Sequence, residues 1–322
     1  MTPSLSDEVA ALAELGPVMV TGGAGFLGSH LVDRLLAAGH EVEVIDDLST
    51  GSMANLDEAR GTGGLKIHRF DVRAPDFTDL VENKRPGVIF HLAGHVGRPG
   101  SIADPVFDAD VNILGTLNVL EAVRANPGTR LVVAVHGLFG RARAVSGPVV
   151  AARPPETPSQ VAAYTVTDYV RVHGDIYELD ARTVALTNVY GPRQQPGEAG
   201  PVVANFVRWA LRGEPLRVDG DGSRTRDLLY VDDAVDALFR AADAPAGVIV
   251  PVGSGTTVTL AALARRVVEL AGSDSVLQAA LPRRFDRDGS AFPLEAAAEI
   301  LNWAPWTSLD EGLKLLLAAT AV

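Results

Sequence analysis

Short apolar runs alternate with stretches of helical period through the first half of the chain. The apolar runs cover residues 17–21, 41–46, 65–69, 87–92 and 130–135, and helical periods cover 25–38, 76–83 and 105–125. Apolar runs of this length, bounded by turn residues, are typical of strands buried on both faces. Their alternation with helices predicts an α/β fold with a Rossmann-type, doubly wound parallel sheet.

A glycine-rich turn joins the first predicted strand to the first predicted helix, in the run Thr21-Gly22-Gly23-Ala24-Gly25-Phe26-Leu27-Gly28. In such a turn Gly22 permits the tight bend, Gly25 lets the backbone approach a pyrophosphate, and Gly28 lets the helix pack close to the strand. The free N–H groups of the helix then face the phosphates. This full context disfavours the alternative of a glycine-rich turn without a ligand.

An acidic residue, Asp46, ends the second predicted strand about 20 residues further on. Its carboxylate is expected to accept hydrogen bonds from the ribose hydroxyls and to repel a 2′-phosphate. The sequence therefore predicts NAD as the cofactor, in preference to NADP.

The composition excludes several classes of function. The formal net charge is -12 and the isoelectric point is about 5.0, which argues against a nucleic-acid or membrane-surface partner. The chain has no cysteine, so disulfides, thiol nucleophiles and Cys-ligated metals are excluded, and we expect no metal site. Residues 1–16 lack the basic and apolar regions of a signal peptide, and no apolar run approaches the length of a membrane span. We expect a cytoplasmic protein.

The pattern loosens in the second half of the chain. A turn-rich stretch at 140–158 predicts a loop over the site, and a helix at 158–179 and a strand at 182–188 follow it. Beyond them Gly and Pro residues are frequent. We expect residues 1–190 to form mainly the NAD-binding domain, and residues 191–322 to form a smaller substrate lobe interleaved with it.

Further motifs follow in a fixed order over nearly the whole chain. They are Asp46-Asp47-Leu48-Ser49-Thr50-Gly51, Asp71-Val72, His91-Leu92-Ala93-Gly94, Ser101-Ile102-Ala103-Asp104-Pro105, Asn112 with Gly115-Thr116, Asn188-Val189-Tyr190-Gly191-Pro192-Arg193-Gln194, Gly220-Asp221-Gly222 with Arg226-Asp227, Tyr230-Val231-Asp232-Asp233, and Asn302-Trp303-Ala304-Pro305. Together with the glycine turn, they resemble the nucleotide-sugar epimerases and dehydratases of the extended short-chain dehydrogenase/reductase family.

The resemblance implies two sets of ligand-binding residues. Besides the three glycines and Asp46, those expected to line the NAD site are Phe26, Leu27, Asp47, Leu48, Ser49, Thr50, Gly51, Asp71, Val72, Leu92, Ala93 and Gly94. Those expected to bind the nucleotide sugar are Arg98, Ser101, Asn188, Val203, Phe206, Val218, Arg226 and Arg283. Within the second set, the resemblance implies that Asn188, Arg226 and Arg283 lie at the diphosphate. The two arginines suit it, because a guanidinium binds phosphate oxygens bidentately. For each arginine, the alternative is a solvated surface charge.

The catalytic residues of the family are a Ser or Thr at a strand end and a Tyr-x-x-x-Lys on the next helix. Tyr164 is the first candidate for the tyrosine, but Asp168 stands where the lysine belongs. A carboxylate there would raise the pKa of the tyrosine, which is the wrong direction for a base.

A second alignment needs no gap. Thr157-Pro158-Ser159-Gln160 predicts a helix start, with Thr157 at the N-cap, Pro158 at N1 and Gln160 at N3 of a capping box. The family begins this helix with Ser-Pro-Tyr, so the gap-free alignment puts Ser159 at the tyrosine position and Ala163 at the lysine position. Aligning Tyr164 instead deletes about five residues within a helix and rotates the remainder of it. We prefer the gap-free alignment.

The third catalytic position is also changed. Counting back from Leu138-Phe139-Gly140, it is occupied by Val135, and His136 follows at the position of the Asp that 4,6-dehydratases of this family use as an acid. Two histidines are therefore candidate acid–base groups, because the unperturbed pKa of histidine suits proton transfer near neutral pH. They are His136 and His95, and for each the alternative is a structural histidine bonded to backbone. Ser159 and Tyr164 complete the candidate catalytic set.

Three functions are compatible with these residues. The first is an NAD-dependent nucleotide-sugar dehydratase, with a UDP-hexosamine as substrate, which oxidises C4 and eliminates water across C5 and C6; His136 favours it. The second is a UDP-sugar 4-epimerase, and the third is a protein that binds NAD and a sugar nucleotide without turnover. The resemblance also implies a homodimer formed through the helices at 105–125 and 158–179.

Overall fold

The computed structural model describes residues 16–95, 97–136, 154–197, 200–281 and 289–321, and its centre is one seven-stranded parallel sheet. In spatial order the strands are β11 (Ile249–Val252), β6 (Ala181–Leu186), β5 (Arg130–His136), β4 (Val88–His91), β1 (Val18–Thr21), β2 (Val42–Ile45) and β3 (Leu65–His68). The predicted fold class is confirmed. Because the strand order reverses between β1 and β4, the carboxyl ends of these two strands border a crevice where such sheets bind ligands.

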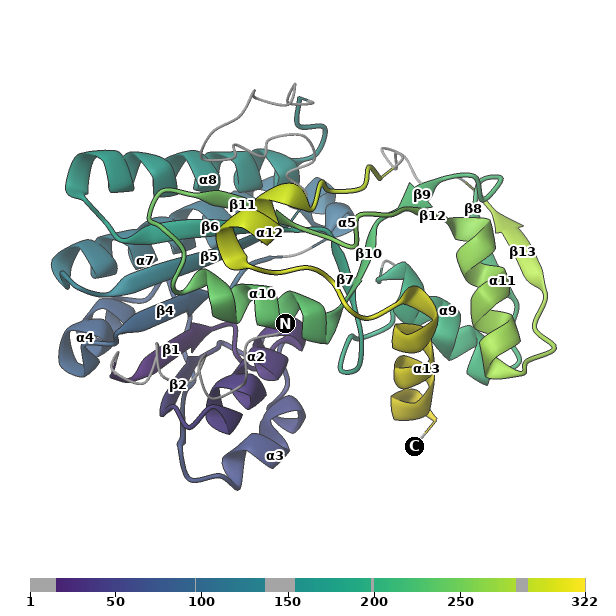
Figure 1. Cartoon of the computed structure of the whole chain (residues 1–322), viewed down its shortest axis with the longest axis horizontal. Coiled ribbons are helices and arrows are strands. Elements are labelled where there is room, and N and C mark those ends of the chain that lie inside the picture. The colour runs from purple at the N-terminus through teal and green to yellow at the C-terminus, as the bar shows by residue number, and fades with distance from the viewer. Residues whose placement is uncertain (1–15, 96, 137–153, 198–199, 282–288, 322) are drawn as a thin grey trace.

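Helices cover both faces of the sheet (Figure 1). On one face lie α4 (Pro75–Lys84), α7 (Gly115–Ala125) and α8 (Pro158–Tyr177), and on the other lie α2 (Phe26–Ala37), α10 (Val231–Ala241) and α12 (Glu295–Leu301). Each face has its own hydrophobic cluster: Phe77 of α4 is fully buried in one, and Leu31 of α2 in the other. Burial on both faces explains why the strands are continuously apolar.

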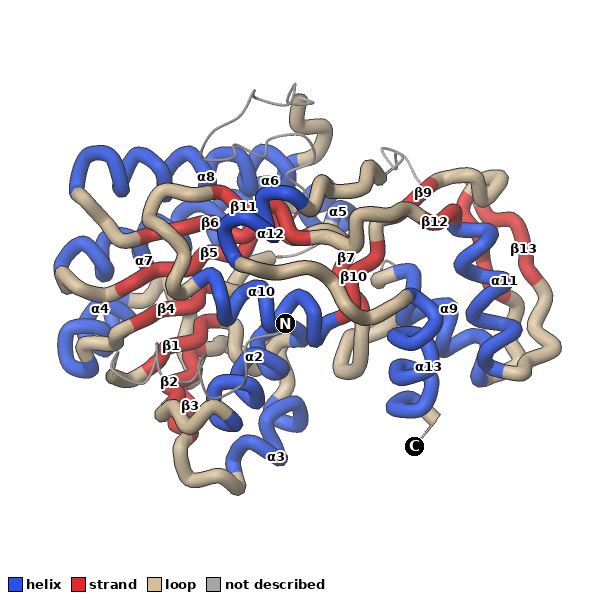
Figure 2. The backbone as a smooth tube through the Cα atoms, viewed as in Figure 1, coloured by secondary structure: helices blue, strands red, loops and turns tan. Residues whose placement is uncertain are grey.

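A smaller lobe lies beside the sheet, at the right of Figure 1. It contains α9 (Val202–Leu211), β8 (Leu216–Asp219), α11 (Leu260–Ala271), β13 (Leu277–Ala280) and α13 (Leu309–Thr320). Two short strand pairs lie between this lobe and the sheet (Figure 2): β7 (Asn188–Tyr190) with β10 (Leu228–Tyr230), and β9 (Thr225–Arg226) with β12 (Val258–Thr259). Both α10 and β11 follow residue 190 in the chain and return to the main sheet, so the two regions exchange segments.

The region between β4 and β5 differs from the predicted single helix at 105–125. It consists of α5 (Arg98–Ala103), α6 (Pro105–Ala109), the π-helical turn η2 (Asp110–Leu114) and α7. Two short helices, η1 (Met53–Leu56) and α3 (Asp57–Arg60), also follow β2. A π-turn accommodates one extra residue without ending the helix, and such turns are frequent at functional sites. Among the described residues, no helix is both long enough and apolar enough to cross a bilayer.

Candidate active site

The glycine turn is packed too tightly for any side chain at two of its three positions. Gly22 has a φ of 69°, and a Cβ there would lie 2.7 Å from the backbone nitrogen of Ala93. A Cβ on Gly28 would lie 2.1 Å from the carbonyl oxygen of Gly22. At Gly25 the nearest such contact is 3.1 Å, again to the oxygen of Gly22. This geometry fits a turn that holds the N-terminus of α2 against β1 and leaves Gly25 free of bulk for a pyrophosphate.

Asp46 is bonded to the glycine turn. Its Oδ2 accepts a hydrogen bond of 2.9 Å from the backbone N–H of Ala24, and its Oδ1 accepts one of 2.8 Å from that of Leu48. Burial raises the pKa of this carboxyl, while the two N–H groups oppose the rise. The carboxylate is therefore held at the end of β2, beside the turn, where a ribose of the dinucleotide is expected.

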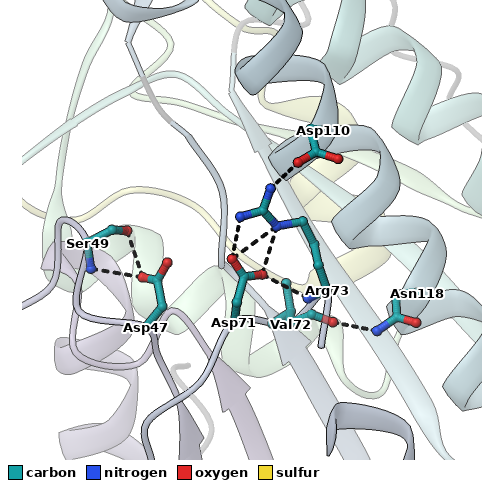
Figure 3. A network of polar contacts seen from close by, with 7 residues as sticks. All are labelled: Asp47, Ser49, Asp71, Val72, Arg73, Asp110 and Asn118. Atoms are coloured by element: carbon teal, nitrogen blue, oxygen red, sulfur yellow. Dashed lines mark hydrogen bonds and ion pairs between the residues drawn. The ribbon is translucent and has the colours of Figure 1, made fainter. Parts of the chain in front are cut away.

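Asp71 and Val72, which are expected to line the NAD site, belong to a polar network with η2 and α7 (Figure 3). Asp71 accepts hydrogen bonds from the Nε and Nη2 atoms of Arg73, and Arg73 also pairs with Asp110 of η2. These bonds from Arg73 hold the pKa of the Asp71 carboxyl below its usual range. The carbonyl of Val72 accepts a hydrogen bond of 2.5 Å from Asn118 of α7. The loop after β3 is thus fixed by the helices that follow β4.

The loop after β2, drawn in the same view, is held by hydrogen bonds between its own residues (Figure 3). Asp47 Oδ1 accepts hydrogen bonds from the backbone N–H of Ser49, at 2.9 Å, and from its hydroxyl, at 2.6 Å. Thr50 is exposed, and a Cβ on Gly51 would lie 2.8 Å from Oδ1 of Asp46. The loop therefore folds back over Asp46. Phe26 and Leu27 begin α2 and are half-buried.

At the end of β4, a buried histidine joins three elements. His91 is 2% exposed, and burial lowers its pKa to about 4. Its Nε2 lies 3.0 Å from the hydroxyl of Thr116, which itself donates to the carbonyl of Asn112. That hydroxyl therefore accepts from Nε2, and Thr21 donates to Nδ1 across 2.8 Å. His91 is a neutral, structural histidine that aligns β1, β4 and α7. Leu92, Ala93 and Gly94 follow it and are half-buried.

Beyond these residues, His95 is held by one side chain of α6 and one of η2. Its Nδ1 lies 3.1 Å from Oδ1 of Asp108, which is 1% exposed. Asn112 Oδ1 accepts a hydrogen bond of 2.8 Å from the backbone N–H of His95, and Asn112 Nδ2 donates to the carbonyl of the same residue. A Cβ on Gly100 would lie 2.7 Å from Nε2 of His95, so the absence of a side chain there leaves room for the ring.

His136 ends β5 and is exposed. Its Nδ1 donates to the carbonyl oxygen of Thr187 over 3.1 Å. Thr187 lies between β6 and β7, directly before Asn188, so this bond connects the end of β5 to the expected diphosphate site. In neutral His136, a proton on Nδ1 leaves Nε2 as the basic nitrogen.

Two of the residues expected at the diphosphate, Asn188 and Arg226, lie on the short strands β7 and β9. Asn188 of β7 pairs with Leu228 of β10, two residues after Arg226, and its Nδ2 donates to the carbonyl of Asp227 over 3.0 Å. Arg226 also lines a cavity of about 240 Å³ together with Ser254 and Trp306. Asn188 is thus bonded to the residue that directly follows Arg226 in the chain.

The helix α8 begins where the sequence predicted. Thr157 is the N-cap and accepts a hydrogen bond from the backbone N–H of Gln160, with Pro158 at N1. The capping box is altered, because Gln160 Oε1 accepts from the N–H of Glu156 and not from that of Thr157. Ser159 lies in the first turn and is half-buried. Tyr164 is 9% exposed and belongs to a hydrophobic cluster, whereas Asp168 is exposed.

Several expected substrate residues offer little surface or are not described. Ser101 is fully buried, and the side chains of Val203, Phe206 and Val218 are at most 6% exposed. These three side chains belong to the core of the lobe, so they have almost no surface with which to contact a base. Arg98 lies in α5, and Arg283 lies outside the described residues. Among the described residues there is no group of three or more side chains suited to hold a metal ion.

Sequence reasoning missed several residues that build this site. Asp108, Arg73 and Thr187 were not expected to take part, yet each bonds directly to an expected site residue. One available signal was the pair of acidic residues Asp108 and Asp110 inside an otherwise apolar helix. The buried carboxylate of Asp108 needs a partner, which is His95. The partly exposed carboxylate of Asp110 pairs with Arg73, and both partners come earlier in the chain.

Comparison with known proteins agrees with this geometry. Residues 18–253 match the NAD dependent epimerase/dehydratase family. The chain is 39% identical over 302 residues to the UDP-glucose 4-epimerase of Mycolicibacterium smegmatis. The aligned region covers 92% of this chain and 95% of that relative. Two solved UDP-glucose 4-epimerases are similar along 94% of this chain and 98% of their own. The Thermotoga maritima enzyme, solved with UDP-glucose, has a TM-score of 0.88 and 32% identity. The Thermus thermophilus enzyme, solved with NAD, has a TM-score of 0.84 and 35% identity.

The residues present fit a dinucleotide: the turn excludes side chains at Gly22 and Gly28, and Asp46 is bonded to it. This chain therefore belongs to the NAD dependent epimerase/dehydratase family, and NAD is its cofactor.

Proposed function

We propose that this protein oxidises a UDP-sugar at C4 and that its net reaction is 4-epimerisation. The observation that carries the proposal is the match to UDP-glucose 4-epimerases along nearly the whole of both chains, including the lobe. Asn188, which is bonded to the neighbour of Arg226, and Arg226 itself support a nucleoside diphosphate as the anchored part of the substrate. The sugar is the reacting part.

Residues of the chain have distinct tasks in this proposal. The glycine turn and Asp46 hold NAD, which when bound supplies the acceptor and later the donor of the C4 hydride. Arg226 and Asn188 hold the diphosphate and orient the sugar. A histidine removes the proton of the 4-hydroxyl and later returns it, because Ser159 and Ala163 stand at the usual tyrosine and lysine positions. A lone serine is a poor base, since the pKa of its hydroxyl is far above neutrality.

A second candidate reaction is the elimination of water across C5 and C6 of a UDP-hexosamine such as UDP-N-acetylglucosamine. His136 favours it, because an acid is needed for the departing 6-hydroxyl and this residue ends β5 at the corresponding position. The 4-ketone formed first acidifies the proton at C5. The two reactions thus share the oxidation of C4 and differ in the fate of the ketone.

One experiment separates these reactions. The protein is incubated with NAD and, separately, with UDP-glucose, UDP-galactose and UDP-N-acetylglucosamine, and the products are separated and weighed by mass spectrometry. An isobaric product with a new retention time supports epimerisation, and a product lighter by one water supports dehydration. Tight binding of UDP-sugars without a product in any of the incubations would contradict both reactions and favour the binding-only alternative.

A homodimer is part of the proposal. Large apolar side chains are exposed on the helices expected at the interface: Val106 of α6 is 76% exposed, Leu114 of η2 is 55% exposed and Ile176 of α8 is 63% exposed. Exposed apolar side chains gathered on neighbouring helices mark an interaction surface. Sedimentation equilibrium would show a species of twice the monomer mass, and Val106→Lys is expected to shift it to the monomer.

A further inference from the structure

We propose that Asp108, supported by Asn112, is a positioning residue that makes His95 the base for the sugar hydroxyl. This inference rests on the proposed function. Asp108 is buried in α6, and His95 lies in the loop after β4, 13 residues earlier.

The contact with Asp108 determines which nitrogen of the His95 imidazole carries the proton. An ionised carboxylate only accepts hydrogen bonds, so the contact of 3.1 Å between Oδ1 of Asp108 and Nδ1 of His95 requires the proton to be on Nδ1. In the neutral ring the lone pair is then on Nε2. A carboxylate holding a histidine in one tautomer in this way is a recurring means of making the other nitrogen a base.

Burial and hydrogen bonds hold Asp108, Asn112 and His95 rigidly together. Asp108 is 1% exposed, and its Oδ2 has no hydrogen-bond partner among the described residues. Its Oδ1 also accepts from Asn112 Nδ2 over 3.2 Å. Because a buried carboxylate is costly without partners, the bonds to His95 and Asn112 are strongly favoured. Asn112 also holds both the N–H and the carbonyl of His95, so backbone and ring are fixed together.

The loop that carries His95 lies beside the glycine turn. A Cβ on Gly22 would touch Ala93, so the loop that carries His95 packs directly on the glycine turn of the dinucleotide site. The side chain of His95 is 21% exposed and thus accessible. The π-turn η2 supplies Asn112 and directly follows α6, which carries Asp108. Such turns are frequent at functional sites. His95 is therefore at the carboxyl edge of the sheet, where ligands bind.

The proton balance is simple. As the C4 hydride leaves, the proton of the 4-hydroxyl moves to Nε2 of His95, and the imidazolium is stabilised by Asp108. When hydride returns to C4, the same proton goes back to the oxygen. His95 ends unchanged, and no further reactant is needed.

The test measures the tautomer directly. Histidine in the NAD-loaded protein is labelled with ¹⁵N, and long-range ¹H–¹⁵N spectra are recorded, with the His95→Gln variant assigning the signal. We expect the Nδ1–H form of His95 in the wild type, and its loss in Asp108→Asn. An Nε2–H form in the wild type would overturn the inference without reference to any variant.

Kinetics supply the second readout. Asp108→Asn is expected to lower kcat at least 100-fold while KM and the amount of bound NAD stay within twofold of the wild type. Asp104→Asn, four residues earlier at the N-cap of α6, is the matched control and is expected to retain wild-type kcat. A kcat for Asp108→Asn within threefold of the wild type would also overturn the inference. If the wild type converts no UDP-sugar, the proposed function fails, and the tautomer alone then decides whether Asp108 positions His95.

Discussion

The backbone N–H of Ala24 donates a hydrogen bond of 2.9 Å to the carboxylate of Asp46. One contact thus links the two sequence features from which the cofactor site was predicted, the glycine turn after β1 and the acidic end of β2. The bond fixes the carboxylate while leaving lone pairs for ribose hydroxyls. The negative charge of the Asp46 carboxylate would also repel the 2′-phosphate of NADP.

Asp46→Asn is expected to weaken NAD binding about 10- to 100-fold, because a charge-assisted hydrogen bond is worth about 1.5–3 kcal/mol. NADP binding should weaken less or improve, because the repulsion is removed. Isothermal titration with both cofactors measures the ratio. Asp57→Asn, an exposed carboxylate in α3, is the control and should leave both affinities unchanged. An unchanged preference for NAD in Asp46→Asn would contradict the assigned role.

Arg226→Lys is expected to weaken UDP binding about 10-fold without affecting NAD, because lysine cannot form the bidentate contact of a guanidinium. Trp306 lines the same cavity and is 58% exposed, so its fluorescence is a suitable reporter. Arg224→Lys, two residues earlier, is the matched control. Equal UDP affinity in wild type and Arg226→Lys would remove this arginine from the diphosphate site.

The response to acid tests the structural role of His91. Its pKa of about 4 lies below the unfolded value of 6.5, so the unfolded chain binds the extra proton between these values. The stability that neutral His91 contributes is therefore present above pH 6.5 and is lost as pH falls toward 4, by about 3 kcal/mol in all. Asp233 acts oppositely: burial raises its pKa to about 6, so acidification through this range favours the fold.

Comparing His91→Gln with the wild type isolates the histidine. The free energy of unfolding in urea is measured from pH 7 to pH 4 for both proteins. The stability advantage of the wild type over His91→Gln should shrink as pH falls, because only the wild type carries the buried histidine. A constant difference across this range would mean that His91 already carries its proton in the folded state or is solvated.

The periodic pattern predicted the parallel sheet and the glycine turn correctly because both depend on short-range sequence. It did not predict α5, since Pro99 and Gly100 disfavour a helix interior, although Pro99 is tolerated in the first turn. The edge strand β11 was also missed: Pro251 interrupts its pattern, which only an edge position tolerates.

The candidate site was predicted unevenly, for a physical reason. Motif residues such as Asp46 act within one βαβ unit, so their spacing in the chain carries the information. The pairing of His95 with Asp108 depends on how α6 packs against the loop after β4, which spacing does not encode. The same holds for the bond from His136 to Thr187, because these residues are 51 positions apart and meet only across adjacent strands.

His136→Ala separates the two candidate reactions. If the protein eliminates water, loss of the acid should lower product formation at least 100-fold while C4 oxidation, seen as NADH absorbance, persists. If it epimerises with His95 as the base, turnover should fall less than tenfold. His173→Gln provides a histidine control outside the site, on α8. An abolished C4 oxidation in His136→Ala would instead make His136 the base.

Restoring the missing pair tests which alignment of α8 is correct. Because Ser159 and Ala163 are one helical turn apart, Ser159→Tyr combined with Ala163→Lys places a tyrosine and a lysine on one face of the helix. A lysine so placed lowers the pKa of a tyrosine, which then serves as a base. The double variant should therefore restore about 100-fold or more of the turnover lost in His95→Gln. The rival pairing, Tyr164 with Asp168→Lys, should restore none, because the gap-free alignment puts Ser159 and not Tyr164 at the tyrosine position. Rescue by the second pair and not by the first would reverse the assignment and make Tyr164 the catalytic tyrosine.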